Sequence, residues 1–255
     1  MIECGSIEYA QARLQSRHGR RATEAQWQQL ESTREFAALL DAARAGPLRT
    51  WVAGLTAQAG SPQIETVLRA HWHAEVAEVV AWMAGPWHAA LAWCAVLPEL
   101  PVLQHLARGG MPDAWMAQDP RWRDLCAVPQ GERAAVLAQG PWTVLARAWP
   151  APDTLAAAWQ AEWHRRLPRP LHDADDSLRQ VAAVLRRHAA AFAAATQGSG
   201  TPLRRALQAR LSLLMRRATL EPAAAFIHLA LSALELERLR GELLVRKLFP
   251  NAKAA

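Results

Sequence analysis

The chain has 255 residues, 51% of them apolar, and its 29 Lys and Arg against 23 Asp and Glu give a formal net charge of +6. Alanine makes up more than a fifth of the chain and β-branched residues are scarce. This composition excludes an all-β sandwich, a collagen-like chain and a disordered acidic tail. No Val/Ile-rich run ends in a glycine loop, which argues against a doubly wound α/β fold. Because strong helix formers dominate, we predict an all-α protein.

The first part of the chain predicts short helices with recognisable starts. Residues 7–20 are expected to form a basic helix. Capping boxes are predicted at Thr23 with Gln26 and at Ser32 with Glu35. The second box would start a helix with apolar residues at helical spacing, which a Gly-Pro pair stops: Phe36, Leu39, Leu40 and Ala43, then Gly46-Pro47.

The remaining helices are predicted from apolar periodicity and from the positions of Gly and Pro. Segment 109–131 is rich in Gly and Pro and is expected to be mainly loop. The predicted helices cover about 62–84, 87–108 (interrupted near Pro98 and Pro101), 132–148, 153–166, 173–195, a stretch opened by Thr201-Pro202 after the Gly198-Ser199-Gly200 turn, and a last long helix that starts at Glu221-Pro222 and ends before Pro250.

One stretch has the length of a membrane span. From Val79 to Pro98 there is no Asp, Glu, Lys or Arg, and about 20 apolar residues suffice to cross a bilayer as a helix. Gly85-Pro86 lies in the middle and is expected to divide the stretch into two short helices. We therefore predict a buried helical hairpin.

The cysteines and the N-terminus predict a reducing compartment. Cys4, Cys94 and Cys126 are far apart and form no C-x-x-C pair, so neither a disulfide framework nor a zinc knuckle is expected. The first five residues, 1–5, carry no basic stretch and no apolar run, so no signal peptide is predicted.

The tryptophans divide the chain into two predicted regions. All twelve lie between Trp27 and Trp163. We predict a Trp-rich helical region at 1–167 and a C-terminal helical region at 168–255, with a seam near Pro168–Pro170. The tryptophans are expected to fill the core between Ala-rich helices.

Two segments of the Trp-rich region resemble each other. Residues 39–53 match 103–117 at a fixed offset, and each is expected to form a helix end, a glycine turn and a short element with a tryptophan. They are two candidate repeat units. The identical pairs are Leu39/Leu103, Ala43/Ala107, Arg44/Arg108, Gly46/Gly110, Trp51/Trp115 and Ala53/Ala117.

Motifs of catalysis are not found in the sequence. There is no G-x-x-x-x-G-K-[ST], G-x-G-x-x-G or G-x-S-x-G pattern. His71, His73 and Glu75 are the most metal-like group, but side chains at i and i+2 point to different faces of a helix. The acidic run 172–176 is expected to cap a helix N-terminus. We predict neither an enzyme nor a cofactor, and a metal-dependent enzyme around His71 and His73 stays an alternative.

The basic charge raises the alternative of nucleic-acid binding. Nucleic-acid-binding proteins gather basic residues on one face or interleave them with aromatics. Here the arginine pairs are dispersed and lie mostly outside the Trp-rich region, so nucleic acid is not the favoured partner. A basic helical nucleic-acid-binding or adaptor protein is kept as the alternative function. The pairs are Arg20-Arg21, Arg165-Arg166, Arg186-Arg187, Arg204-Arg205 and Arg216-Arg217.

The two ends of the chain resemble one family, the central-stalk subunit of rotary V/A-type ATPases, which has prokaryotic and eukaryotic members. Segment 9–17 is similar to its opening Tyr-x-x-Ala-Arg basic helix, and 32–40 to its S-x-x-E helix with paired leucines. The segment 220–250 is similar to its closing E-x-E-x-x-N-L-R helix, with Arg238 at the asparagine position. The positions carried over as motif and interaction candidates are Tyr9, Arg13, Arg17, Glu235, Glu237, Arg240 and Lys247.

The resemblance implies a fold of related helical bundles around a funnel-like surface. It implies a non-catalytic protein, without a small-molecule substrate, that couples the rotating shaft to the membrane proteolipid ring. The partners would be the shaft subunits and the ring. The location would be cytoplasmic and peripheral on the inner membrane face, where a positive surface can meet anionic headgroups.

Overall fold

The computed structural model describes residues 6–169, 174–195 and 200–249, and in these residues it contains α- and 3₁₀-helices and no strand. This confirms the all-α prediction. The 3₁₀ segments are η1 (Gly85–Trp87), η2 (Cys94–Glu99), η3 (Met116–Gln118), η4 (Gln130–Glu132), η5 (Thr143–Ala148) and η6 (Pro152–Thr154). The α-helices are α1 (Ile7–Gly19), α2 (Glu24–Ser32), α3 (Phe36–Ala45), α4 (Arg49–Val52), α5 (Ser61–Trp82), α6 (His88–Trp93), α7 (Leu100–Ala107), α8 (Pro120–Ala127), α9 (Arg133–Gln139), α10 (Leu155–Arg166), α11 (Ala174–Ala193), α12 (Gly200–Arg217) and α13 (Ala223–Leu248).

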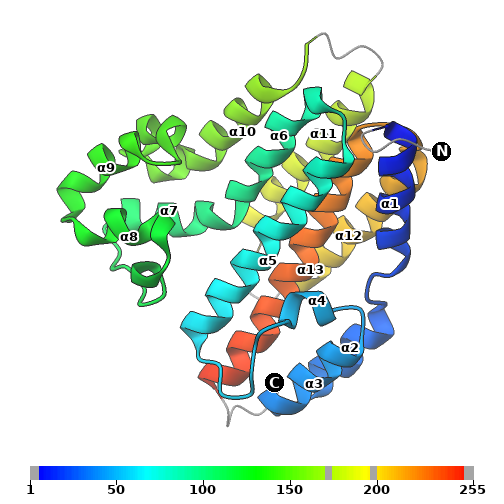
Figure 1. Ribbon diagram of the computed structural model, residues 1–255, viewed down its shortest axis with the longest axis horizontal. Helices are drawn as coiled ribbons and strands as arrows, with labels where there is room; N and C mark the ends of the chain where they lie inside the picture. The colour runs from blue at the N-terminus through cyan, green and yellow to red at the C-terminus, as the bar shows by residue number, and fades with distance from the viewer. Residues whose placement is uncertain (1–5, 170–173, 196–199, 250–255) are drawn as a thin grey trace.

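The long helices α5 and α13 form the centre of the molecule. Figure 1 shows α8 and α9 at one end of the long axis and α1 at the other, with α5 and α13 between them. The helix α13 packs against α1, α3, α5, α11 and α12. The last helix thus lies among elements of the first 167 residues. The division into 1–167 and 168–255 and the funnel-like arrangement stay predictions.

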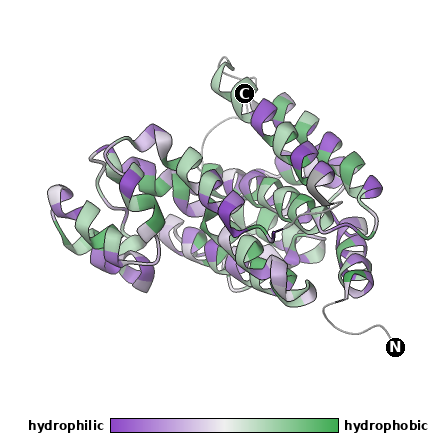
Figure 2. Ribbon diagram, turned by 90° about the horizontal axis from the view of Figure 1, so that it is seen from above, coloured by the Kyte–Doolittle hydropathy of each residue, from purple (hydrophilic) through white to green (hydrophobic). Residues whose placement is uncertain are grey.

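The burial of α13 follows from its sequence. The predicted core-facing leucines, Leu229, Leu236, Leu239 and Leu243, are all buried, as expected. The first turns, 223–231, are buried on nearly every side, which is the behaviour of a helix that is apolar all round. Figure 2 shows that other helices carry both hydrophilic and hydrophobic residues along their length.

The apolar stretch after α5 breaks where Gly85-Pro86 predicts. The helix α5 ends at Trp82, and the short α6 that follows η1 packs back against it. By length and composition the described residues contain one candidate membrane span, Gly85–Ala107, and half of its most apolar window is buried inside the protein. The predicted helix at 87–108 is divided into α6, η2 and α7 because Pro98 and Pro101 lack the N–H that a continuous helix needs.

Tryptophans fill the interior, as predicted. Ten of the twelve are buried, and Trp87 and Trp159 are partly buried against the core. Around α8, the ring of Trp122 lies 5.9 Å from that of Trp115 and 4.3 Å from that of Trp142, measured between centroids. Flat, rigid rings of this size supply much of the apolar contact of a region with short helices.

Two capping predictions had opposite outcomes. Thr23 and Gln26 form the expected capping box at the start of α2. The box predicted at Ser32 with Glu35 is wrong: α2 runs through Ser32, whose hydroxyl donates to the carbonyl of Gln29 at 2.8 Å. Glu35 is the N-cap residue of α3 and makes no side-chain cap. The pattern therefore marks the end of one helix and the start of the next.

The loop prediction for 109–131 is wrong in its second half, which contains α8. Asp119 caps this helix by accepting from the N–H of Arg121 at 3.0 Å, and Pro120 occupies its first position. Proline at a first helical position is favourable because its missing N–H has no helical partner there. The predicted helix 132–148 ends at Gln139 and resumes as η5 after Gly140-Pro141.

The two similar segments, 39–53 and 103–117, both lead through a glycine to a buried tryptophan. Their turns differ, since Gly109 has a φ of +89° whereas Ala45, at the equivalent position, ends helix α3 without a positive φ. Their origin as a repeat stays a prediction. Some predictions fall outside the part of the chain that the structure describes. They concern residues 1–5 with Cys4, Pro170, the acidic side chains at 172–175, the Gly198-Ser199 turn and Pro250.

Candidate functional site

A cavity of about 730 Å³ lies where α1, the α3–α4 link, α5 and α13 meet. Side chains from both ends of the chain line it, together with the middle of α5. We call it the arginine cavity. Its charged lining residues are Arg17, Arg20, Arg21, Arg49, Glu75 and Glu235.

A buried histidine and carboxylate form the floor of this cavity. His228 Nε2 of α13 lies 2.7 Å from Glu75 Oε1 of α5, and Arg17 Nη1 donates to Glu75 Oε2 at 2.6 Å. Burial raises the pKa of Glu75, but the His228 hydrogen bond and the charges of Arg17 and Arg21 outweigh it and hold this pKa below its usual value. Burial lowers the pKa of His228, despite the opposing effect of Glu75. His228 is therefore neutral and donates its Nε2–H to an ionised Glu75.

Arg21 joins the segment after α1 to α13. Its Nη2 donates to Ser232 Oγ at 2.6 Å and to the carbonyl of His228 at 3.1 Å, and it lies 3.5 Å from the acceptor Nδ1 of that ring. Its Nη1 lies 3.5 Å from Glu235 Oε2. Glu235 also accepts from Trp51 Nε1 at 3.2 Å and from the backbone N–H of Ala22 at 3.4 Å. Three separate segments are thus joined at this point.

The charges of the residues that line the arginine cavity do not balance. Four guanidinium groups and two carboxylates line it, so the lining itself carries an excess of two positive charges while His228 is neutral. Glu78, which lies outside the lining, also pairs with Arg17. Arg20 and Arg49 are exposed, and within the described residues neither has a carboxylate at ion-pair distance.

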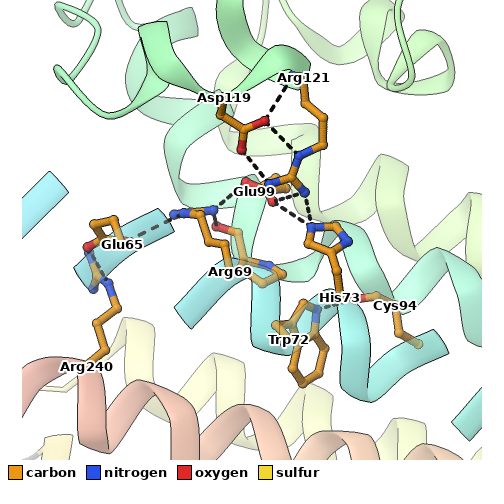
Figure 3. A network of polar contacts seen from close by, with 10 residues as sticks. Glu65, Arg69, Trp72, His73, Cys94, Glu99, Asp119, Arg121 and Arg240 are labelled. Atoms are coloured by element: carbon orange, nitrogen blue, oxygen red, sulfur yellow. Dashed lines mark hydrogen bonds and ion pairs between the residues drawn. The ribbon is translucent and has the colours of Figure 1, made fainter. Parts of the chain in front are cut away.

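A second polar group, which we call the ion-pair chain, links α13 to α8 through α5 (Figure 3). Arg240 Nη2 lies 2.6 Å from Glu65 Oε1, and Glu65 Oε2 lies 3.6 Å from Arg69 Nε. Arg69 also pairs with Glu99, whose other oxygen lies 3.3 Å from Arg121 Nη1. Positive and negative groups alternate and balance. The chain consists of Arg240, Glu65, Arg69, Glu99, Arg121 and Asp119.

The charged residues carried over from the family motifs lie in different surroundings. Arg17 and Glu235 meet in the arginine cavity. Arg240 ends the ion-pair chain, and Glu237 lies beside it, exposed, with an oxygen 4.0 Å from Arg240 Nη1. The two glutamates of the E-x-E pattern are therefore separated by the structure: Glu235 is partly buried at the cavity, and Glu237 faces solvent.

The other motif residues make aromatic contacts. Arg13 donates to Tyr9 Oη at 3.2 Å, and its guanidinium lies 5.9 Å from the ring centre of Trp82. Lys247 Nζ lies 5.1 Å from the ring centre of Phe36. The Arg13–Tyr9 contact lies within α1, while the contacts to Trp82 and Phe36 attach the middle of α1 and the end of α13 to neighbouring helices. None of the three motif residues lines the arginine cavity.

The histidines of the metal-like group reach different partners. His71 Nε2 lies 2.8 Å from the carbonyl of Ala53, and His73 Nε2 lies 3.2 Å from Glu99 Oε1. Glu75 forms its hydrogen bond with His228 instead. In the part of the chain that the structure describes, no group of three or more His, Cys, Asp or Glu is placed to hold a metal ion.

The thiol of Cys94 is unsuited to nucleophilic chemistry. It is enclosed in the core, and burial raises its pKa to about 12. A thiol must ionise to attack, so this group is inert at neutral pH.

Reasoning from sequence missed His228, Arg21 and Glu99. His228 stands alone in the apolar run 223–231, and an isolated polar residue in a buried helix needs a partner. Glu99 lies at the edge of an uncharged stretch. For His228 and Glu99 the sequence thus carries a local signal, but their partners are more than twenty residues away in sequence.

Comparisons with family models, with curated proteins and with solved structures found no match for this chain.

Proposed function

We propose that this chain is a non-catalytic central-stalk subunit of a V/A-type rotary ATPase, which joins the rotating shaft to the membrane proteolipid ring. The observation that carries the proposal is the contact between the two segments that resemble the family. They stand about 200 residues apart in sequence, yet α13 packs against α1 and α3.

A network of arginine contacts supports this pairing. Arg238 of α13 donates to Glu24 at 3.0 Å and to Glu31 at 2.8 Å, and its guanidinium lies 4.5 Å from the ring centre of Trp27. Arg246 donates to the carbonyls of Leu30 and Glu31 at the end of α2. Charge-assisted bonds to carbonyls at a helix C-terminus are favourable.

A subunit that transmits torque needs such connections. Load applied to one helix must reach another helix without local unfolding. Long-range ion pairs and ring contacts that hold the first helices of the chain against α13 resist such unfolding. The ion-pair chain, which links α13 to α8 through α5, serves as a structural tie in the same way. The net charge of +6 favours a location beside an anionic membrane surface, peripheral on its cytoplasmic face.

The test is co-expression with the shaft and proteolipid-ring subunits encoded in the same genome. We expect the tagged chain to co-purify with both at a fixed stoichiometry. We also expect that leaving it out separates the shaft from ring-containing membranes. A folded chain that retains neither partner would overturn the proposal.

A matched pair of variants sharpens this test. Arg238→Gln removes one of the two arginine contacts between α2 and α13, whereas Arg205→Gln on α12 removes a different contact to Glu24, with a distance of 2.7 Å. We expect the first variant to weaken coupling of ATP turnover to ion movement, and the second to leave it near wild type. Equal coupling in both variants would contradict a role of the α2–α13 contact in torque transfer.

Two further measurements address the alternatives. A salt-dependent shift of nucleic acid by the purified chain would favour the nucleic-acid-binding or adaptor function. A stoichiometric metal found by elemental analysis would favour an enzyme around His71 and His73.

A further inference from the structure

We propose that the arginine cavity is a binding site for a small phosphate-bearing anion. The ligand class is an inorganic or organic phosphate with at least two negative charges. The inference does not depend on the proposed function, because it rests only on the residues that line this cavity.

Every oxygen of the cavity carboxylates already has a hydrogen-bond or ion-pair partner. Both oxygens of Glu75 are engaged, one by His228 at 2.7 Å and the other by Arg17 at 2.6 Å. The oxygens of Glu235 are engaged by Ala22 N–H and by Trp51 Nε1 with Arg21. Neither carboxylate of the lining lies at ion-pair distance from Arg20 or Arg49.

The donors of the cavity do have free capacity. Arg20 and Arg49 line it from separate segments, the end of α1 and the start of α4, and neither has an ion-pair partner in the described part of the chain. Thr50 also lines the cavity, next to Arg49. What the lining offers a ligand is therefore donors and an excess of two positive charges.

One guanidinium group of the cavity, Arg21, also acts on a neighbouring histidine outside the lining. Burial lowers the pKa of His18, and the charges of Arg21 and Arg216 lower it further. Gathering like charges is unfavourable unless a counter-charge is present. A dianion in the cavity would supply that counter-charge.

Chemistry and size favour phosphate over a simple halide or a monocarboxylate. Planar guanidinium groups bind tetrahedral phosphate oxygens through two parallel hydrogen bonds. The volume of about 730 Å³ lies within the usual range for small-molecule sites and exceeds what one phosphate group fills. The cavity therefore has room for a second phosphate or for an organic remainder.

The test uses inorganic pyrophosphate as the probe, in titration calorimetry and thermal unfolding, with sodium chloride adjusted to constant ionic strength. We expect saturable binding by the wild-type chain. The double variant Arg20→Gln/Arg49→Gln should bind about tenfold more weakly or worse, because it loses charge-assisted hydrogen bonds. Both residues are exposed, so the variant should fold normally.

The matched control is Arg123→Gln/Arg147→Gln, which makes the same change of net charge on exposed residues of α8 and η5. It should bind pyrophosphate within about twofold of wild type, since surface charges this far away are largely screened. Absence of binding by the wild-type chain would overturn the proposal. So would an equal loss in both double variants, which would show attraction by net charge alone.

A second arm identifies the source of the phosphate. Phosphatidylcholine vesicles that contain phosphatidic acid, whose phosphomonoester headgroup can carry two negative charges, are offered to the same proteins, with and without pyrophosphate. Vesicle binding that pyrophosphate displaces, and that Arg20→Gln/Arg49→Gln removes, supports the site with a lipid headgroup as ligand. Pyrophosphate binding without vesicle binding supports the site with a free phosphate compound as ligand.

Discussion

The arginine cavity and the ion-pair chain are built on the same two helices and differ in how their charges are matched. Glu75 and Glu65 both belong to α5 and stand ten residues, or about 15 Å, apart. In the ion-pair chain, Glu99 is 0% exposed and lies between two arginines, so the centre of this network is closed to solvent. The cavity opens to solvent and holds more guanidinium groups than carboxylates. A closed, balanced network stabilises a fold, whereas an open, unbalanced one is available to a ligand.

The largest expected effect is on the closed network. Glu99→Gln leaves Arg69 and Arg121 without their shared carboxylate, and breaking a buried ion pair costs about 3–5 kcal/mol in the free energy of unfolding. Urea denaturation measures it. The control Asp153→Asn breaks an exposed pair with Arg108 and should cost less than about 0.5 kcal/mol. Similar losses in the two variants would show that the ion-pair chain is not the closed network described above.

A smaller effect is expected at the floor of the cavity. Glu75→Gln should lower the free energy of unfolding by about 1–3 kcal/mol, because the amide keeps one hydrogen bond and Arg17 keeps its pair with Glu78. The same denaturation experiment measures it. Glu78→Gln removes the exposed partner of Arg17 and serves as the control, with a cost below about 1 kcal/mol. A larger loss for Glu75→Gln than for Glu99→Gln would reverse the comparison between the two networks.

The third prediction concerns pH. Because burial lowers the pKa of His228 below its usual 6.5, the unfolded chain takes up a proton that the folded chain does not. Stability should therefore fall as pH drops below about 6.5, by up to about 1.4 kcal/mol per pH unit from this residue. Lowered pKa values of His18 and His188 act in the same direction. Glu75, whose pKa is also lowered, contributes only at more acidic pH.

Denaturation at pH 7 and pH 5.5 isolates the contribution of His228. The variant His228→Gln should lose about 1 kcal/mol less than wild type over this interval. The exposed His105→Gln is the control and should keep the wild-type difference. A wild-type pH dependence in His228→Gln would mean that this ring is not the buried neutral base of the cavity.

The smallest effect is expected for the two exposed arginines of the cavity. Without a phosphate ligand, Arg20→Gln/Arg49→Gln should change the free energy of unfolding by less than about 0.5 kcal/mol, as is usual for exposed residues. Any change should be a gain at low ionic strength, because like charges are removed from one cavity. Urea denaturation at two salt concentrations measures it. A large loss would assign these residues to the fold rather than to a ligand, and would place the cavity with the ion-pair chain as a structural network.

Local patterns accounted for much of the fold. The Thr23 capping box, the stop at Gly46-Pro47 and the break at Gly85-Pro86 act over a few residues, so they could be predicted from sequence. Predictions failed where one signal has two local meanings. Pro120 is of a type common in loops but begins α8, and Ser32 fits a capping pattern but ends α2.

The candidate sites could be predicted only in part. Arg17, Glu235 and Arg240 were singled out by resemblance, and each lies in one of the two networks. Their partners could not be predicted, because Glu75 and His228 are 153 residues apart and meet only when α5 packs against α13. The family motifs also include Tyr9 and Lys247, which make aromatic contacts away from the cavity.

The sequence by itself determined the all-α class, most helix boundaries and the burial of the tryptophans, because helix propensity, capping and apolar periodicity act within a few turns. The tertiary structure alone decided which charges meet. Ion pairs across helices depend on the orientation of whole elements, and a rotation of α13 or a one-residue shift along its axis would give His228, Glu235 and Arg240 different partners. The balance of the ion-pair chain and the positive excess of the arginine cavity therefore arise from helix packing, in which residues from positions 17 to 240 are brought together.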